Sequence, residues 1–118
     1  MYASRSSPAI DLSEIHTYAP LHPSAADNNW DAIIARVNEF PDDGHAAKLV
    51  RALAHGQKIC EPYEGREEFR VKGADWLRMG HMAIDSVEMT KRFGMNGTWV
   101  RSAGFEEAWA DVPLRSQL

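Results

Sequence analysis

The chain has 118 residues, of which 44% are hydrophobic and 25% are charged, a composition typical of one globular domain with a single core. Its net charge is −4, from 13 basic and 17 acidic residues, and no window concentrates lysine and arginine, which argues against a nucleic-acid-binding protein. No apolar run approaches the ~20 residues of a membrane-spanning helix, and no secretory signal is evident.

The only cysteine, Cys60, excludes an intramolecular disulfide and any zinc site built from several thiolates. Its expected place is the end of a helix, as a small buried hydrophobe, since no motif sets a base beside it. This cysteine usage favours a reducing compartment, and we predict a cytoplasmic protein.

Residues 1–28 are predicted to form an irregular N-terminal segment. Pro8, Pro20 and Pro23 rule out a long helix there, and Leu12 and Ile15 allow one short turn at most. An irregular lead of this length is expected to lie against another surface.

A helical period then begins and predicts a first main helix over about 29–40. Asn28 or Asn29 is the expected N-cap, and Pro41 disfavours helix at the residue before it. The apolar side chains recur at steps of three and four, at Trp30, Ile33, Ile34, Val37 and Phe40.

The second helix is predicted over about 43–60, with Asp42 or Asp43 as its cap. The connection of two or three residues makes it an antiparallel neighbour of the first helix or sets a sharp corner. Its expected apolar stripe consists of Ala46, Leu49, Val50, Leu53 and Ile59.

A third helix is predicted over about 75–93, capped by Asp75, and a short C-terminal helix between Gly104 and Ala110. Between the second and third helices, residues 69–72 alternate and predict at most one short extended piece. Gly80 costs about 1 kcal/mol relative to alanine within a helix unless a close backbone contact requires it. The expected fold class is all-α, and residues 29–118 make up the helical part.

His45 and Lys48 are the first candidates for chemistry. They lie roughly 60° apart on the second helix, one turn from its start. A buried cation beside a histidine is costly, so the pair is either solvated or kept for chemistry, and the spacing leaves both open. The line continues through Ala52, His55 and Ile59, but His55 lies about 15 Å further along the axis and cannot share a metal with His45.

His81 and Asp85 are the second candidates, four residues apart on the third helix. Together with Arg78, Glu88 and Arg92 they predict a charged and solvated helix face. The alternative is a carboxylate that orients a general base, although no serine or cysteine nucleophile is placed beside the pair.

Three segments carry a resemblance to a known family: DDGHAAKLVRALAHGQ at 42–57, FRVKGADWLRMGHMAIDSVE at 69–88 and TWVRSAGFEEAWADVP at 98–113. In this order they resemble the C-terminal part of the questin oxidase-like family. These are mostly fungal oxidoreductases of polyketide and anthraquinone metabolism, among them Baeyer–Villiger-type ring-opening enzymes. The resemblance covers about residues 30–113, and we expect no family counterpart for the first 29.

The resemblance implies a longer, largely helical enzyme, of which this chain is the C-terminal portion. It implies that the DGHxxK segment belongs to a non-haem iron site, with His45 as a ligand and Lys48 as a carboxylated lysine ligand. The remaining ligands would lie in sequence upstream. The family also suggests NADPH, although the chain carries no dinucleotide-binding fingerprint.

The leading hypothesis is therefore an oxidoreductase, of monooxygenase or dioxygenase type, that inserts oxygen into an aromatic polyketide or anthraquinone substrate. The alternative is a non-catalytic, truncated helical module that associates with a partner or with its own copies, because exposed apolar stripes would drive association.

Overall fold

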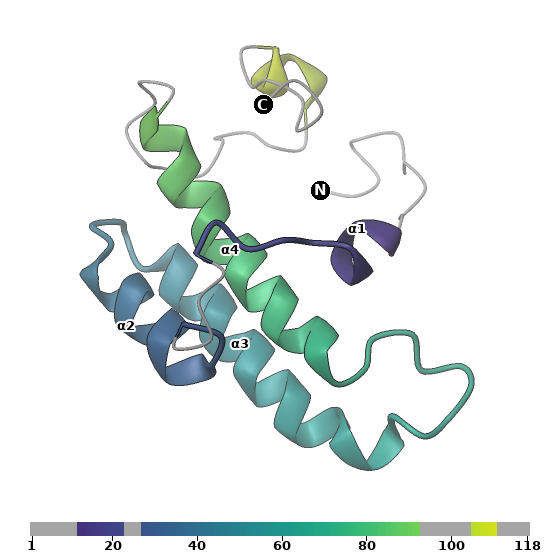
Figure 1. Cartoon of the computed structure of the whole chain (residues 1–118). Helices are drawn as coiled ribbons and strands as arrows, with labels where there is room; N and C mark the ends of the chain where they lie inside the picture. The colour runs from purple at the N-terminus through teal and green to yellow at the C-terminus, as the bar shows by residue number, and fades with distance from the viewer. Residues whose placement is uncertain (1–11, 23–26, 93–104, 111–118) are drawn as a thin grey trace. The chain divides into compact units, whose positions relative to one another are not determined.

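A computed structural model describes residues 12–22, 27–92 and 105–110 of the chain (Figure 1). The described residues are helical and contain no strand, which confirms the all-α class. The short extended piece allowed at 69–72 does not form a strand, because Val71 is a bend and its neighbours there have no regular secondary structure. In chain order the elements are α1 (Ser13–His16), α2 (Trp30–Glu39), α3 (His45–Cys60), the 3-10 helix η2 (Glu61–Tyr63), α4 (Ala74–Arg92) and the 3-10 helix η3 (Glu106–Trp109).

The chain divides into two compact units. One comprises Leu12–Thr98 and contains α1 to α4, and the other comprises Met1–Asp11 with Trp99–Leu118 and contains η3. The short C-terminal helix is thus present, as a single 3-10 turn. Of the irregular segment expected at 1–28, the described part holds α1, whereas 1–11 and 23–26 lie outside the described residues.

The first main helix, α2, matches its prediction to within a residue at each end. The Asn29 side chain accepts a hydrogen bond from the backbone N–H of Ala32 at 2.9 Å and caps the helix. Phe40 is already extended, at φ −77° and ψ 121°, as expected for the residue before Pro41.

Helix α3 begins at His45, two residues later than predicted, because Gly44 adopts a left-handed conformation with φ +88°. The acidic cap is nevertheless present. The Asp42 carboxylate accepts hydrogen bonds from the backbone N–H groups of Gly44, at 2.8 Å, and Ala46, at 2.9 Å.

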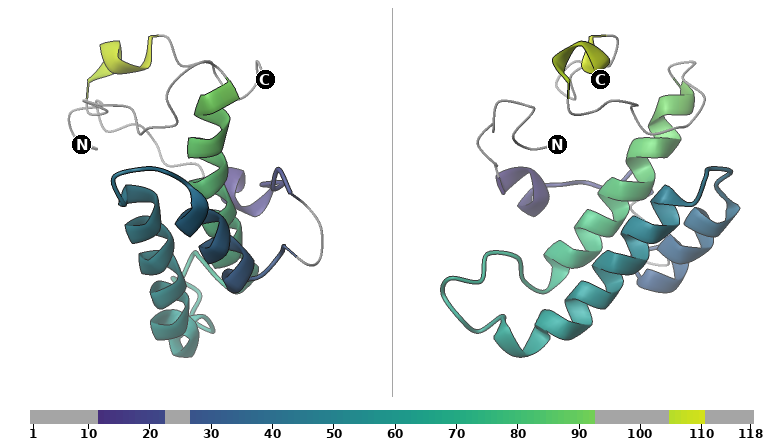
Figure 2. Two further views of the ribbon diagram at one scale, coloured as in Figure 1. Left: turned by 90° about the vertical axis from the view of Figure 1, so that its left-hand side faces the viewer. Right: turned by 180° about the vertical axis from the view of Figure 1, so that it is seen from behind.

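The helices α2, α3 and α4 pack side by side around one small core, with α3 antiparallel to both others (Figures 1 and 2). The buried apolar side chains come from all three helices: Ile33, Val37, Phe40, Ala46, Val50, Ala83, Ile84 and Val87. The predicted stripe of α3 is only half right, because Leu49 and Ile59 keep 40% and 53% of their surface exposed. None of the helices in the described residues combines the length and the apolar character needed to span a bilayer.

Two glycines bring the helices into close contact, each beneath a tryptophan. A Cβ added at Gly80 of α4 would lie 2.7 Å from the Trp30 ring, and one added at Gly56 of α3 would lie 2.8 Å from the Trp76 ring. The ring N–H of Trp30 also donates to Gln57 Oε1 at 2.6 Å. The close contact considered for Gly80 from the sequence is therefore confirmed.

Candidate functional site

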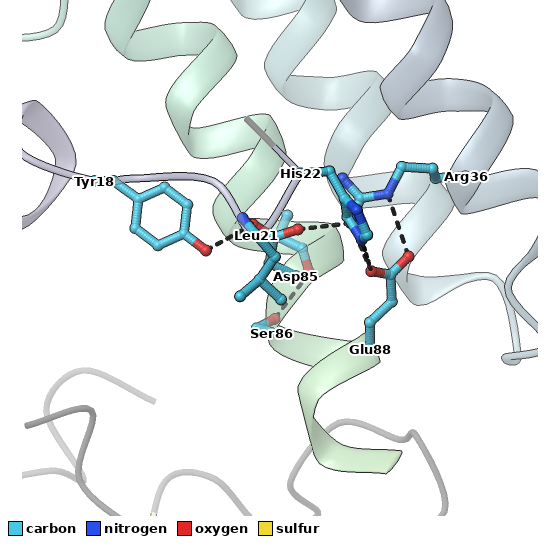
Figure 3. Close-up of polar contacts among 8 residues, drawn as sticks. Tyr18, Leu21, His22, Arg36, Asp85, Ser86 and Glu88 are labelled. Carbon is cyan, nitrogen blue, oxygen red and sulfur yellow. Dashed lines mark hydrogen bonds and ion pairs between the residues drawn. The ribbon is translucent and has the colours of Figure 1, made fainter. Parts of the chain in front are cut away.

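Asp85 of α4 is a buried carboxylate that accepts three hydrogen bonds (Figure 3). Its Oδ2 accepts hydrogen bonds from the Tyr18 hydroxyl at 2.8 Å and from the backbone N–H of Leu21 at 3.0 Å. Its Oδ1 accepts one from Arg36 Nη2 at 2.6 Å. We call Tyr18, Leu21, Arg36, Asp85 and Glu88 the Asp85 cluster. It joins the segment after α1, helix α2 and helix α4 at one point.

Arg36 is held by two carboxylates one turn apart. Its Nε donates to Glu88 Oε1 at 3.3 Å, and its Nη2 donates to Glu88 Oε2 at 2.5 Å as well as to Asp85. Burial by itself would lower the pKa of Arg36, but the hydrogen bonds and charges of Glu88 and Asp85 outweigh it and raise that pKa. The guanidinium is therefore a permanent cation, and His22 lies at the edge with its Nε2 3.8 Å from Glu88 Oε2.

The solvated face predicted around His81 and Asp85 is wrong. Both residues keep only 1% of their surface exposed. The physical reason is that α2 and the segment after α1 cover this side of α4, and Arg36 neutralises the buried carboxylate. The spacing of four residues does place His81 and Asp85 on one helix face, but the pattern within α4 cannot show which neighbours cover that face.

His81 is the unusual member of this region, because neither ring nitrogen has a hydrogen-bond partner in the part of the chain that the structure describes. Burial lowers the pKa of His81 and outweighs the opposing charge of Asp85, and the charge of Arg36 lowers it further. The ring is therefore neutral in the folded chain at neutral pH.

The depressed pKa of His81 predicts acid-sensitive stability. The unfolded chain binds a proton at this histidine near pH 6.5, above the pKa of the folded chain, so the folded state loses stability as the pH falls below about 6.5. The expected slope is at most about 1.4 kcal/mol per pH unit. Urea unfolding at pH 7.5, 6.5 and 5.5 measures this dependence of stability on pH. The substitution His81→Phe should flatten the slope, whereas His55→Phe, at an exposed position of α3, should not. Equal slopes for the wild type and His81→Phe would contradict the assignment.

A second buried carboxylate, Asp75, fixes the other end of the segment that contains α1. Its Oδ1 accepts hydrogen bonds from His16 Nδ1 at 3.0 Å and from Arg78 Nη1 at 2.9 Å, and its Oδ2 accepts one from the backbone N–H of Lys72. Burial alone would raise the pKa of Asp75, but the hydrogen bonds from His16 and Lys72 and the charges nearby lower it. Asp75 is thus an anchor within α4 rather than the predicted cap.

The structure places His45 and Lys48 on the outer side of α3, where both are exposed. The side chain of His45 is 60% exposed, and its Nδ1 contacts the Asp43 carboxylate. The hydrogen bond from His45 holds the pKa of Asp43 below its ordinary value. An imidazole that donates from Nδ1 to a carboxylate keeps its lone pair on Nε2, an arrangement common in metal-binding histidines.

The residues present fit a metal ion only in part. The contact of His45 Nδ1 with the Asp43 carboxylate suits Nε2 for binding a metal, but the Lys48 side chain is exposed. In the described ranges no three histidine, cysteine or acidic side chains come together as a metal site. These two side chains therefore do not make an iron site by themselves.

Sequence reasoning missed Tyr18 and Arg36. Arg36 comes three residues after Ile33 and directly before Val37, both buried, so its place at the edge of the apolar stripe was a usable signal. Tyr18 lies outside any periodic segment, and its contact with Asp85 spans 67 residues of sequence, which no local pattern reveals.

A comparison with protein families matches residues 1–53 to the model described as questin oxidase-like. Over 115 residues the chain is 41% identical to the Baeyer-Villiger oxidase mdpL of Emericella nidulans, a match that covers 98% of this chain and 25% of that protein. The chain belongs to the questin oxidase-like family. The matched range includes the first 29 residues, so the expectation that they have no family counterpart is wrong.

Matches to other relatives likewise cover nearly all of this chain and about a quarter of the relative. The questin oxidase of Aspergillus fumigatus is 37% identical, with 95% of this chain and 24% of that protein covered. The oxidoreductase AflY of Aspergillus parasiticus is 33% identical, with 99% of this chain and 28% of that protein covered. The chain thus spans about a quarter of the length of the curated relatives it matches. No solved structure matches the chain.

Proposed function

We propose that this chain is the C-terminal helical part of an oxidoreductase that inserts oxygen beside an aromatic ketone. The observation that carries the proposal is the 41% identity to a Baeyer-Villiger oxidase over 98% of the chain. A Baeyer–Villiger step places one oxygen atom between a carbonyl carbon and its neighbour, and in a ring this forms a lactone that hydrolysis opens. The second oxygen atom of dioxygen leaves as water, which requires a two-electron reductant such as NADPH.

The substrate class we propose is an aromatic polyketide of the anthraquinone type. Its support is the name of one relative, questin oxidase, which is 37% identical to this chain. Within the described residues, the Asp85 cluster is a hydrogen-bonded support for the helices rather than an open reactive centre, because its carboxylates are engaged by Tyr18 and Arg36.

The test of this proposal is a chimera. We expect the Aspergillus fumigatus questin oxidase, with the matching quarter of its length replaced by this chain, to incorporate one atom of ¹⁸O from ¹⁸O₂ into questin. Mass spectrometry of the product measures it, and the relative lacking that quarter is the negative control. A folded and soluble chimera that consumes no oxygen and labels no product would overturn the proposal.

The iron ligands stay a prediction. If His45 and Lys48 bind non-haem iron, further ligands must come from outside the described residues, among which no three candidate ligands come together. Bound iron would supply the means to activate dioxygen. The free Nε2 of His45 supports the prediction, and the exposure of Lys48 does not.

Metal analysis of the purified chimera described above, in which the rest of the relative can supply the further ligands, tests the iron prediction. We expect His45→Ala and Lys48→Ala to lower the bound iron about tenfold or more, and Asp43→Asn to lower it about tenfold by releasing the His45 ring. The matched control is His55→Ala, an exposed histidine of the same helix. Equal iron in the wild type and all four variants would refute the assignment.

The second candidate function is a non-catalytic helical module that associates through α3. The exposed side chains of Leu49 and Ile59 favour it. Sedimentation of the chain between micromolar and millimolar concentrations tests this second function, since a monomer at every concentration would count against self-association. The cytoplasmic location expected from the single cysteine stays a prediction.

A further inference from the structure

The buried side of α4 carries hydrogen-bonding capacity that the described chain does not use. A neutral imidazole has one N–H donor and one lone-pair acceptor, and neither nitrogen of His81 has a partner. Arg36 contributes a third unpartnered atom, Nη1, which is buried as well. Leaving such groups unpaired in an interior is costly, so native proteins almost always satisfy them.

These atoms belong to one place in the fold. His81 lies four residues before Asp85, one turn along the same face of α4. The guanidinium of Arg36 sits on Asp85, with Nη2 2.6 Å from Oδ1. Arg36 is close enough to His81 for its charge to lower the pKa of that ring. His81 and the Arg36 guanidinium thus both neighbour Asp85, where α2 packs against α4.

The neighbouring carboxylates do not satisfy these nitrogens in the described chain. Asp85 accepts from Tyr18, Leu21 and Arg36 Nη2, and Glu88 accepts from Arg36 Nε and Nη2, but neither carboxylate bonds to Arg36 Nη1 or to His81. The partner of His81 and Nη1 must therefore be a group that does not belong to the Asp85 cluster.

The chemistry of the site restricts that group. An anion is disfavoured because the two carboxylates already outnumber the single guanidinium, and a metal cation is disfavoured because Nη1 presents only N–H donors. A hydroxyl oxygen meets both demands, since its lone pair accepts from Nη1 while it donates to, or accepts from, the ring of His81.

We propose that His81 and Arg36 form a buried binding site for one neutral hydroxyl oxygen. The oxygen comes from a trapped water molecule or from the phenolic hydroxyl of an aromatic ligand. Only the phenol source rests on the function proposed above, so a water at this site would leave the site standing whatever the activity of the protein.

Nuclear magnetic resonance of the ¹⁵N-histidine-labelled chain tests the site directly, with His81→Phe to assign the ring signals. We expect a single neutral tautomer of His81 and, in the free chain, cross-relaxation between its ring N–H and a long-lived water. If the oxygen comes from a phenol, the water signal is absent and the ring ¹⁵N shifts change when 1,8-dihydroxyanthraquinone is added. Anthraquinone, which lacks the hydroxyls, should leave the shifts unchanged. A His81 ring that exchanges between tautomers and shows neither the water contact nor the ligand-induced shift overturns the proposal.

Unfolding equilibria at pH 7.5 provide a second readout. If a hydroxyl occupies the site, His81→Phe lowers the ratio of folded to unfolded chain about fivefold to tenfold, because Arg36 Nη1 loses its bridging partner. The variant His81→Gln, which keeps a donor and an acceptor, should recover part of that loss, and His55→Phe should change the ratio less than twofold. If the nitrogens are simply unpaired, His81→Phe increases the ratio, and that result also overturns the proposal.

Discussion

Replacing Asp85 by asparagine is expected to destabilise the chain by about 3–5 kcal/mol, the largest effect we foresee for one residue. The substitution removes one of the two carboxylates that pair with the buried Arg36 in the described chain and leaves Glu88 as the other. It also leaves one oxygen where two now accept from Tyr18, Leu21 and Arg36. Urea unfolding followed by circular dichroism measures the loss.

The control for this prediction is Asp31→Asn, which changes the same chemical group at an exposed position in the first turn of α2. Only about 0.5 kcal/mol should be lost there, from the interaction with the helix dipole. An equal effect of the two substitutions would show that the Asp85 cluster does not hold α2 and the segment after α1 on α4.

Replacing Gly80 by alanine is expected to destabilise the chain by about 2 kcal/mol, although alanine is the better helix former by about 1 kcal/mol. The added Cβ would lie 2.7 Å from the Trp30 ring and 3.2 Å from Ile33 Cδ1. Neither neighbour yields easily, because Ile33 is fully buried and the Trp30 ring is fixed by its hydrogen bond to Gln57.

The matched control is Gly65→Ala, whose Cβ would meet no atom within 4 Å, so a change of less than about 0.5 kcal/mol is expected. In a Trp30→Leu background the cost of Gly80→Ala should fall, since the smaller side chain makes room. An undiminished cost in that background would place the clash elsewhere.

Several features of this protein follow from local sequence alone. The spacing of Ile33 and Val37, the Asn29 cap and Pro41 define α2, because period, capping and the restriction before proline all act within a few residues. The same holds for the all-α class and for the bounds of α4, which the sequence placed at about 75–93 and the structure places at Ala74–Arg92. The family resemblance likewise came from ordered segments of sequence, and the match to curated relatives confirmed it.

The burial of polar residues did not follow from local sequence. His81 and Asp85 have the spacing of a solvated helix face, and only the approach of Arg36 from α2 and of Tyr18 from a segment 67 residues away covers them. Leu49 and Ile59 have the spacing of a core, yet they remain exposed. Helical periodicity shows which side chains share a face, because it depends on the pitch of one helix.

Periodicity does not show what lies against that face, because covering a face is a contact between elements distant in the chain. The sequence by itself therefore determined the three main helices, their approximate bounds and the family of this protein. Only the tertiary structure decided that the outer side of α3 carries His45 and Lys48 in solvent, and that the buried side of α4 carries His81 with both ring nitrogens unpartnered in the described chain.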